Sequence, residues 1–239
     1  MAQYNTLAKF YDDVIGLNGV AENFIVKCIN KYNKSASSLL DLGCGTGTNL
    51  VYLEKHYDVE GIDLSVEMIR IAKKKLPGVK FIKDDITRFD TKKTYDCIIC
   101  LYDTINHVLS FAGWKSLFKK VNAHLNQGGL FIFDINTLEK MNYMAEYGSF
   151  VHRFDKNYLV MDVIKKSPSK FDWDAKIFEH VKGDNYKLYR ELIPEVTFET
   201  EKIVVEVEKH FELLKQVNDM GFDSGDFPQR IYFICRKKN

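Results

Sequence analysis

Apolar and polar positions alternate along the chain in blocks that predict strands and helices in turn. Short apolar runs of the kind that form buried strands lie at 38–42, 59–64, 79–83, 95–101 and 130–135. Positions with helical periodicity lie between these runs, at 48–56, 66–75 and 111–125. Strands that alternate with helices indicate an α/β fold built on a parallel sheet.

The two ends of the chain extend this pattern. Residues 1–35 are predicted to be helical, with a break near 16–19 where Gly and Asn residues gather. Residues 209–219 are predicted to form a helix that ends at Gly221, and 231–235 to form the final strand.

The pattern changes after Asn136. Alternating apolar and polar positions predict antiparallel strands at 158–164, 176–181, 186–192 and 201–207. A βαβ arrangement would place one helix there, so this part is expected to be an insertion. We expect residues 140–205 to form an antiparallel β insertion that acts as a substrate lid or a dimer surface. Residues 1–139 and 206–239 would then form the core.

A glycine-rich loop joins the first predicted strand to the first helix, with the pattern Asp41-x-Gly43-x-Gly45-x-Gly47. Such glycines let the backbone turn sharply and admit a ligand where a Cβ would block it. The first amides of the helix then face that ligand. The dinucleotide fingerprint G-x-G-x-x-G fails, because its sixth position is Thr48 or Leu50, depending on the starting glycine. The carboxylate of Asp41 suits a cationic ligand and repels pyrophosphate.

This loop resembles motif I of the class I S-adenosylmethionine-dependent methyltransferases of the small-molecule type. The run Leu-x-x-Gly-Gly-x-Phe-x-Phe-Asp at 125–134 matches a late motif of that family, and Tyr-x-x-x-Ala-x-x-Tyr-Asp at 4–12 resembles its N-terminal lid helix. The resemblance implies a Rossmann-like, mostly parallel sheet of seven strands with an antiparallel last strand. It also implies S-adenosyl-L-methionine as the cofactor and S-adenosyl-L-homocysteine as the product.

The resemblance assigns cofactor contacts to the carboxyl ends of the first four strands. Asp63 lies 20 residues after Gly43, where this family and Rossmann dehydrogenases both place an acid for the ribose hydroxyls. At the third strand, Asp85 with Ile86 is favoured over Asp84 for the adenine. The expected cofactor contacts are Asp41, Gly43, Gly45, Gly47, Asp63, Leu64, Met68, Asp85, Ile86 and the backbone of Leu101.

Methyl transfer from a sulfonium requires an in-line approach, a desolvated cleft and a neutral nucleophile. A base is needed only if the attacking N or O must lose a proton. His107, six residues past the fourth strand, is the expected base, because imidazole titrates near neutral pH. Its surroundings resemble the matching segment of glycine N-methyltransferase and of the sugar-amine N,N-dimethyltransferases. Tyr11, in the N-terminal lid, is the second expected residue at the reacting centre.

The sequence departs from the patterns of three other methyltransferase chemistries. The segment after the fourth strand lacks the Pro-Pro of enzymes that methylate amino groups of DNA and RNA. Cys100 lies inside that strand, not after it as the cytosine-C5 nucleophile does. Ile135 separates Asp134 from Asn136, which are adjacent in metal-dependent catechol-type enzymes. We therefore expect no metal.

The composition narrows the expected partners and compartment. With 34 basic and 33 acidic residues, the net charge of +1 gives no global field for nucleic acid. The start of the chain lacks an apolar signal region, and no stretch approaches 18 apolar residues, so neither secretion nor membrane insertion is expected. The five cysteines fall mostly in apolar runs and indicate buried thiols in a reducing, cytoplasmic setting.

These patterns predict a metal-independent S-adenosylmethionine-dependent methyltransferase that moves a methyl group to an N or O of a small-molecule acceptor by in-line displacement. An RNA or protein methyltransferase and a non-catalytic S-adenosylmethionine-binding regulatory protein stay open as alternatives. A nicotinamide dehydrogenase disagrees with the glycine spacing. The sequence leaves open the acceptor, the choice of N or O, and whether the protein is a monomer or a homodimer.

Overall fold

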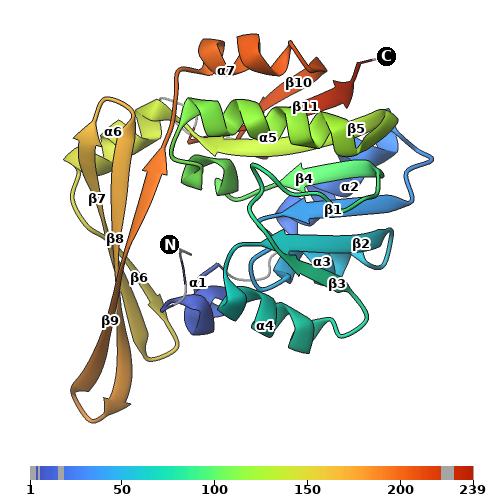
Figure 1. Cartoon of the computed structure of the whole chain (residues 1–239). Helices are drawn as coiled ribbons and strands as arrows, with labels where there is room; N and C mark the ends of the chain where they lie inside the picture. The colour runs from blue at the N-terminus through green and yellow to red at the C-terminus, as the bar shows by residue number, and fades with distance from the viewer. Residues whose placement is uncertain (1–3, 5, 16–18, 222–228, 239) are drawn as a thin grey trace.

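Two sheets organise the chain in the computed structural model, which describes residues 4, 6–15, 19–221 and 229–238 (Figure 1). The larger sheet has seven strands in the order β10-β11-β5-β4-β1-β2-β3, and the smaller has four in the order β6-β7-β8-β9. The smaller sheet stands beyond the carboxyl ends of the parallel strands (Figure 1). It therefore faces the edge at which open parallel sheets bind ligands.

The larger sheet is mostly parallel. Its parallel strands in chain order are β1 (Ser38–Leu42), β2 (Asp58–Asp63), β3 (Lys80–Lys83), β4 (Tyr95–Cys100) and β5 (Leu125–Asn136). The last strand, β11 (Arg230–Lys237), pairs antiparallel with both β5 and β10 (Phe211–Asn218). The predicted Rossmann-like fold class with an antiparallel last strand is confirmed.

Helices cover both faces of this sheet. Those with buried residues in its two apolar clusters are α2 (Val20–Tyr32), α3 (Thr48–Leu53) and α4 (Val66–Lys75) on one face, and α5 (Phe111–His124) and α7 (Thr200–Val207) on the other. Side chains of β5 point alternately to the two faces of the sheet, so Ile132 belongs to one cluster and Phe131 and Phe133 belong to the other. The central strands are therefore buried on both sides, as their continuous apolar runs predict.

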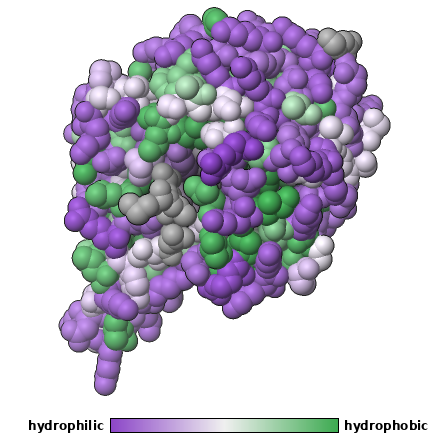
Figure 2. Space-filling model, in the orientation of Figure 1, coloured by the Kyte–Doolittle hydropathy of each residue, from purple (hydrophilic) through white to green (hydrophobic). Residues whose placement is uncertain are grey.

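The smaller sheet is antiparallel throughout and consists of β6 (Phe150–Phe154), β7 (Asn157–Ser167), β8 (Lys170–Lys182) and β9 (Asn185–Val196). Its inner face packs with α6 (Leu138–Glu146) and with the N-terminal segment, η1 (Ala8–Phe10) and α1 (Tyr11–Ile15), in a third apolar cluster that includes Leu7, Phe10 and Met141. Figure 2 shows a largely hydrophilic face with apolar residues gathered near its middle. The predicted antiparallel strands at 158–164, 176–181 and 186–192 are all present.

Two sequence-based element assignments are wrong. Residues 201–207 form helix α7, not a strand. Three consecutive β-branched residues there favour a strand locally, but Ile203 and Val207, one helical turn apart, are both buried. Residues 211–218 form strand β10, not a helix. A register shift between Leu213 and Lys215 interrupts the alternation, so that the apolar positions imitate a helical period.

The predicted break near 16–19 lies outside the described residues except at Gly19. Two further 3₁₀ turns complete the described elements, η2 (Thr104–His107) and η3 (Asp219–Gly221). Within the described ranges, no helix has the length and apolar character needed to cross a bilayer.

Phe133 offers a test of the core. Its ring is fully buried and stacks on Phe233 with the centroids 4.7 Å apart. We expect Phe133→Ala to lower the free energy of unfolding by about 3–5 kcal/mol, because the cavity is bounded by two sheet strands and cannot collapse. Val205→Ala on the exposed face of α7 is the control, with an expected change within about 0.5 kcal/mol. Urea denaturation measures both, and equal losses would contradict this description of the core.

Candidate active site

A cavity of about 430 Å³ opens where the parallel strands of the larger sheet end. Most of the expected site residues lie in its wall, namely Tyr11, Gly43, Gly45, Asp63, Leu64, Met68, Asp85, Ile86 and His107. Three expected residues do not line it: Asp41, Gly47 and Leu101. Asp41 and Leu101 are both buried at strand ends, beneath the loops that form the wall.

The three glycines of the loop serve different purposes. All have positive φ, which favours glycine. A Cβ on Gly43 would lie 2.3 Å from Thr104 Cγ2, so this glycine lets the segment after β4 pack on the loop. Gly45 faces the Tyr11 ring on the cavity side, where a Cβ would lie 3.7 Å from Tyr11 Cε1. Gly47 faces the opposite way, where a Cβ would lie 3.2 Å from Ala72 Cβ, so it shapes the turn into α3 and does not border the cavity.

Asp63 is fixed at the end of β2 by two backbone amides. Gly45 N–H donates to Oδ2 at 2.9 Å and Ser65 N–H donates to Oδ1 at 2.7 Å. Burial raises the pKa of this carboxyl even though these amides stabilise its charged form. Each oxygen keeps a lone pair, and the side chain lies in the cavity wall. The carboxylate can therefore accept hydrogen bonds from a pair of ligand hydroxyls.

Asp41 is a buried carboxyl that lacks a full set of partners. Its side chain is 1% exposed, and Oδ2 has no hydrogen-bond partner in the described part of the chain. Burial, with the charge of Asp63 adding to it, raises the pKa of Asp41 to about 7. A cationic ligand group beside the glycine loop would offset this cost, because a nearby positive charge stabilises the carboxylate. The residues present thus fit a positively charged ligand.

Asp85 closes the far end of the cavity. Its Oδ1 accepts hydrogen bonds from Thr87 N–H at 2.9 Å and from Thr87 Oγ1 at 2.8 Å. Asp84 and Ile86 on either side also line the cavity. This turn therefore presents an acidic and an apolar side chain together, as a nucleobase site requires.

The N-terminal segment is tied over the glycine loop by Asp12. Its Oδ1 accepts from Thr46 Oγ1 at 2.5 Å and from Thr48 Oγ1 at 2.7 Å, and its Oδ2 accepts from Lys75 Nζ at 2.8 Å. Burial would raise the pKa of Asp12, but these hydrogen bonds hold it below its usual value. This latch, formed by Asp12, Thr46, Thr48 and Lys75, places Tyr11 in the cavity wall.

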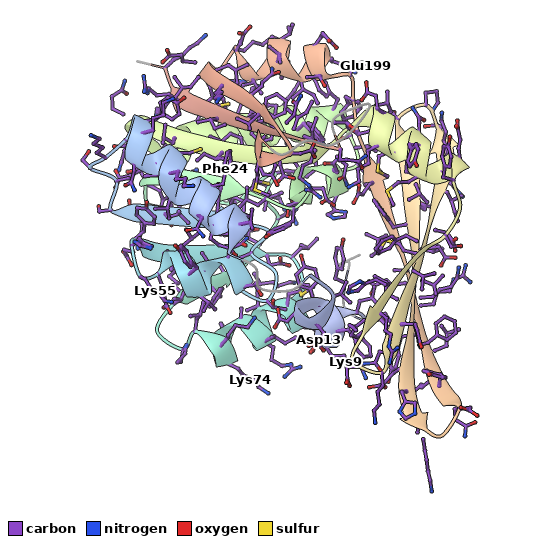
Figure 3. The ribbon with its side chains drawn as sticks, turned by 180° about the vertical axis from the view of Figure 1, so that it is seen from behind. Lys9, Asp13, Phe24, Lys55, Lys74 and Glu199 are labelled. Carbon is purple, nitrogen blue, oxygen red and sulfur yellow. The ribbon has the colours of Figure 1, made fainter. Side chains whose placement is uncertain are left out.

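A second cavity, of about 580 Å³, lies between the N-terminal segment and the four-stranded sheet. Lys9 and Asp13 mark the N-terminal segment beside that sheet in Figure 3, and Lys9 Nζ bonds Glu179 Oε1 of the sheet at 3.0 Å. We call this space the sheet chamber. It shares three wall residues with the first cavity: Tyr4, Tyr11 and Tyr102. The two cavities therefore meet at a junction of tyrosines.

His107 lies at this junction. Its Nδ1 is 3.5 Å from the Pro194 carbonyl oxygen, so Nδ1 carries the proton and Nε2 accepts from Tyr4 Oη at 3.2 Å. Burial lowers the pKa of His107, although the charge of Asp103 opposes this. The imidazole is therefore neutral near pH 7, with its lone pair on Nε2.

A buried charged cluster lies behind His107. Arg230 of β11 donates hydrogen bonds to both carboxylates, from Nη2 to Asp103 and from Nη1 to Asp134. Burial would raise the pKa of Asp103, but Arg230 outweighs it and leaves that pKa below its usual value. Burial raises the pKa of Glu195 far above its usual value, and the hydrogen bond between Glu195 and Asp103 adds to this. Burial and the neighbouring charge of Asp103 therefore both favour the neutral form of Glu195.

Sequence reasoning did not find Arg230, Glu195 or Lys140, which border the sheet chamber. Arg230 and Asp103 are 127 residues apart, and no motif surrounds either Arg230 or Glu195. One signal was present for Arg230, which directly precedes the apolar run at 231–235. Asp103, His107 and Glu195 also offer atoms within 4.8 Å of one another, a grouping the sequence did not predict.

The latch can be tested through Lys75. We expect Lys75→Met to speed amide hydrogen exchange across residues 8–15 by about two- to tenfold, because it removes a hydrogen bond of about 0.5–1.5 kcal/mol. Lys74→Met, at the exposed neighbouring position labelled in Figure 3, is the control and should leave exchange unchanged. Mass spectrometry of deuterated peptides measures both. An identical effect of the two variants would show that Lys75 does not hold the N-terminal segment.

Known proteins resemble this chain along its whole length. A methyltransferase domain model matches residues 39–129. A Geobacillus protein provisionally named as a methyltransferase is 25% identical over 98% of this chain and 99% of its own. The solved structure of an S-adenosylmethionine-dependent methyltransferase from Clostridium acetobutylicum is also 25% identical, covers 99% of both chains and superposes with a TM-score of 0.86.

A relative with a named substrate matches over a shorter region. The dTDP-3-amino-3,6-dideoxy-alpha-D-glucopyranose N,N-dimethyltransferase of Streptomyces fradiae is 27% identical over 44% of this chain and 42% of its own length. The domain match contains the glycine loop, Asp63 and Asp85, which the structure brings together around one cavity. The chain is therefore an S-adenosylmethionine-dependent methyltransferase that resembles the class I family, with S-adenosyl-L-methionine as its cofactor and S-adenosyl-L-homocysteine as its product.

Proposed function

We propose that this enzyme methylates the nitrogen of a small-molecule amine. The observation that carries the proposal is the meeting of two cavities at Tyr4, Tyr11 and Tyr102, with His107 beside them and its Nε2 bonded to the Tyr4 hydroxyl. One cavity contains the glycine loop, and the other is large enough for a small organic molecule. The dimethyltransferase activity named for the Streptomyces fradiae relative supports nitrogen over oxygen.

The first cavity would hold the cofactor. In this proposal Asp63 accepts hydrogen bonds from the ribose hydroxyls, while Leu64, Met68, Asp85 and Ile86 surround the adenine. Asp41, with the backbone of Gly43, Gly45 and Leu101, would stabilise the positively charged methionyl end of the cofactor. Gly47 would contribute only by shaping the turn into α3. The bound cofactor supplies an electrophilic methyl group on a sulfonium. The unpartnered Asp41 oxygen is the feature that best fits its positive charge.

The chain's own groups would then prepare the acceptor. The amine nitrogen must be neutral to attack, so a proton has to leave it before or after transfer. The imidazole of His107 is neutral and its Nε2 faces the junction, where it can take that proton when the amine replaces the Tyr4 hydroxyl as its partner. The nitrogen forms a bond to the methyl carbon as the carbon–sulfur bond breaks, and the electron pair of that bond stays on sulfur. The proton lost by nitrogen ends on His107 and passes to solvent.

The tyrosines would exclude water and align the two partners. Tyr4 and Tyr11 pack edge to face with centroids 5.8 Å apart, and Tyr4 packs against His107 in the same way at 5.4 Å. Burial raises the pKa of Tyr11 and Tyr4 well above the usual value, so both hydroxyls stay protonated. Orientation of reactants in such a desolvated site contributes much of the rate in a displacement reaction.

A metal-assisted transfer to oxygen is the second candidate. The atoms of Asp103, His107 and Glu195 lie close enough together to bind one divalent cation. We favour the metal-independent reaction, because Arg230 already matches the charge of Asp103. The two candidates differ in whether EDTA abolishes turnover and added Mg²⁺ restores it.

Asp63 tests the cofactor half of the proposal. We expect Asp63→Ala to weaken S-adenosylhomocysteine binding by about a hundredfold, because hydrogen bonds to a charged group contribute about 1.5–3 kcal/mol each. Asp58→Ala, at the exposed start of the same strand, is the matched control. Calorimetry gives the affinities, and thermal shifts with S-adenosylmethionine and NAD test selectivity. Stabilisation by NAD, or equal behaviour of the two variants, would refute the assignment.

His107 tests the chemical half. With an amine acceptor found by screening, we expect His107→Gln to lower kcat by about 10²–10⁴ while cofactor affinity stays unchanged. Only the neutral imidazole can accept a proton, so kcat of the wild type should fall when the pH drops through the pKa of His107. Because that pKa is lowered, the fall should occur below pH 6.5, the ordinary pKa of histidine. The variant should lose this fall of kcat at low pH. If the fall is the same in the variant, His107 is not the base.

A further inference from the structure

The walls of the sheet chamber divide into an apolar body and a polar end. The body is lined by Leu7 and Phe10 of the N-terminal segment and by the inner face of the four-stranded sheet, including Leu159, Met161, Trp173, Ile177 and Ile193. The polar end is made by Asp103, Asn136, Lys140, Glu195 and Arg230. A ligand that fills this space must therefore be apolar along most of its length and polar at one end.

The polar end is arranged to bind a cationic nitrogen. His107 Nε2 lies 4.0 Å from Asp103 Oδ2 and 3.6 Å from Glu195 Oε1, so one amino group can lie beside all three residues and donate to the two carboxyl groups. Glu195 is 2% exposed, and Asn136 Nδ2 donates to its other oxygen at 3.2 Å, which fixes the carboxyl. An ammonium group placed there would lie beside the carboxyl groups of both Asp103 and Glu195. The same position adjoins Tyr4, at the junction with the cofactor cavity.

The cations at this end are already committed. Arg230 bonds Asp103 and Asp134, and Lys140 Nζ donates to Asn136 Oδ1 at 2.8 Å. Burial also lowers the pKa of Lys140, and the charge of Arg230 adds to this. Among the described residues that line the chamber, no other Lys or Arg is present. A phosphate or pyrophosphate would thus meet Glu195 and Asp103 without an uncommitted cation to balance its charge.

We propose that the acceptor is a hydrophobic amine, with an aromatic or branched aliphatic body in the sheet chamber and a primary or secondary amino group beside Asp103, His107 and Glu195. The proposal rests on the proposed function and narrows its substrate class. The proposed substrate differs from the nucleotide-linked amino sugar named for the Streptomyces fradiae relative. Methyl transfer to this amine would follow the bond changes given above.

Calorimetry on the full chain saturated with S-adenosylhomocysteine tests the chamber without turnover. The probes are phenylbutylamine, the uncharged phenylbutanol and a dTDP-linked 3-amino sugar. We expect the amine to bind about tenfold or more tightly than the alcohol, since only the amine carries a charge for the carboxylates. The nucleotide sugar should give no heat. Tighter binding of the nucleotide sugar than of the amine would overturn the proposal.

Neighbouring residues on β7 provide matched variants. Met161 lines the chamber, whereas Val160 is the adjacent residue on the same strand and points to the other face. Met161→Asp places a charge in the apolar body and should weaken amine binding by about tenfold or more. Val160→Asp should leave it unchanged, and melting temperatures show whether both variants fold. If the two variants bind the amine alike, the probe does not occupy the chamber and the proposal fails.

Turnover separates this proposal from the one it rests on. Methylation of phenylbutylamine with binding lost in Met161→Asp supports both. If the amine binds in the chamber but no tested amine is methylated, the proposed function fails while the assignment of the chamber stands. If only the nucleotide-linked sugar is methylated, nitrogen transfer stands and the hydrophobic-amine proposal fails.

Discussion

The buried guanidinium of Arg230 is the contact on which the site depends. It joins β11 to Asp134 of β5 and to Asp103, in the segment that follows β4. Asp103 has a positive φ, and its backbone N–H donates a hydrogen bond to Asp134 Oδ2 at 3.0 Å. Removing one member of such a buried group leaves uncompensated charge, at a cost of about 3–5 kcal/mol. This constraint fixes the turn that carries His107 and holds the polar end of the sheet chamber in place.

The antiparallel last strand has a purpose in this arrangement. Because β11 runs opposite to β5, its first residue lies beside the last residue of β5, and Arg230 pairs in register with Asn136. A parallel strand in that place would begin at the far edge of the sheet. The direction of the last strand thus brings a cation from near the end of the chain to the edge where the ligands bind.

The sequence predicts the larger sheet and most of the wall of the first cavity, but it predicts few of the residues that line the sheet chamber. The glycine loop and Asp63 were identifiable because the backbone geometry requires these residues at a short, fixed spacing, and such a spacing can be read directly from the sequence. The junction was only partly predicted: Tyr11 and His107 were named, but Glu195 and Arg230 were not. Those side chains meet through contacts between distant segments, for which no spacing rule exists. The strand β10 was misread for a related reason, because its bulge is set by its pairing with β11.

The division between the two sheets has an evolutionary consequence. Residues that border the first cavity come mainly from loops of the larger sheet, whereas many residues of the sheet chamber come from the smaller sheet, whose strands pair with one another and not with the larger sheet. Substitutions on that inner face can alter which molecule is accepted while leaving the chemistry of transfer intact. In such a scaffold the smaller sheet can vary in sequence while the loops of the larger sheet stay constrained. Tyr11 lines both cavities, so a substitution at this position changes the wall of both at once.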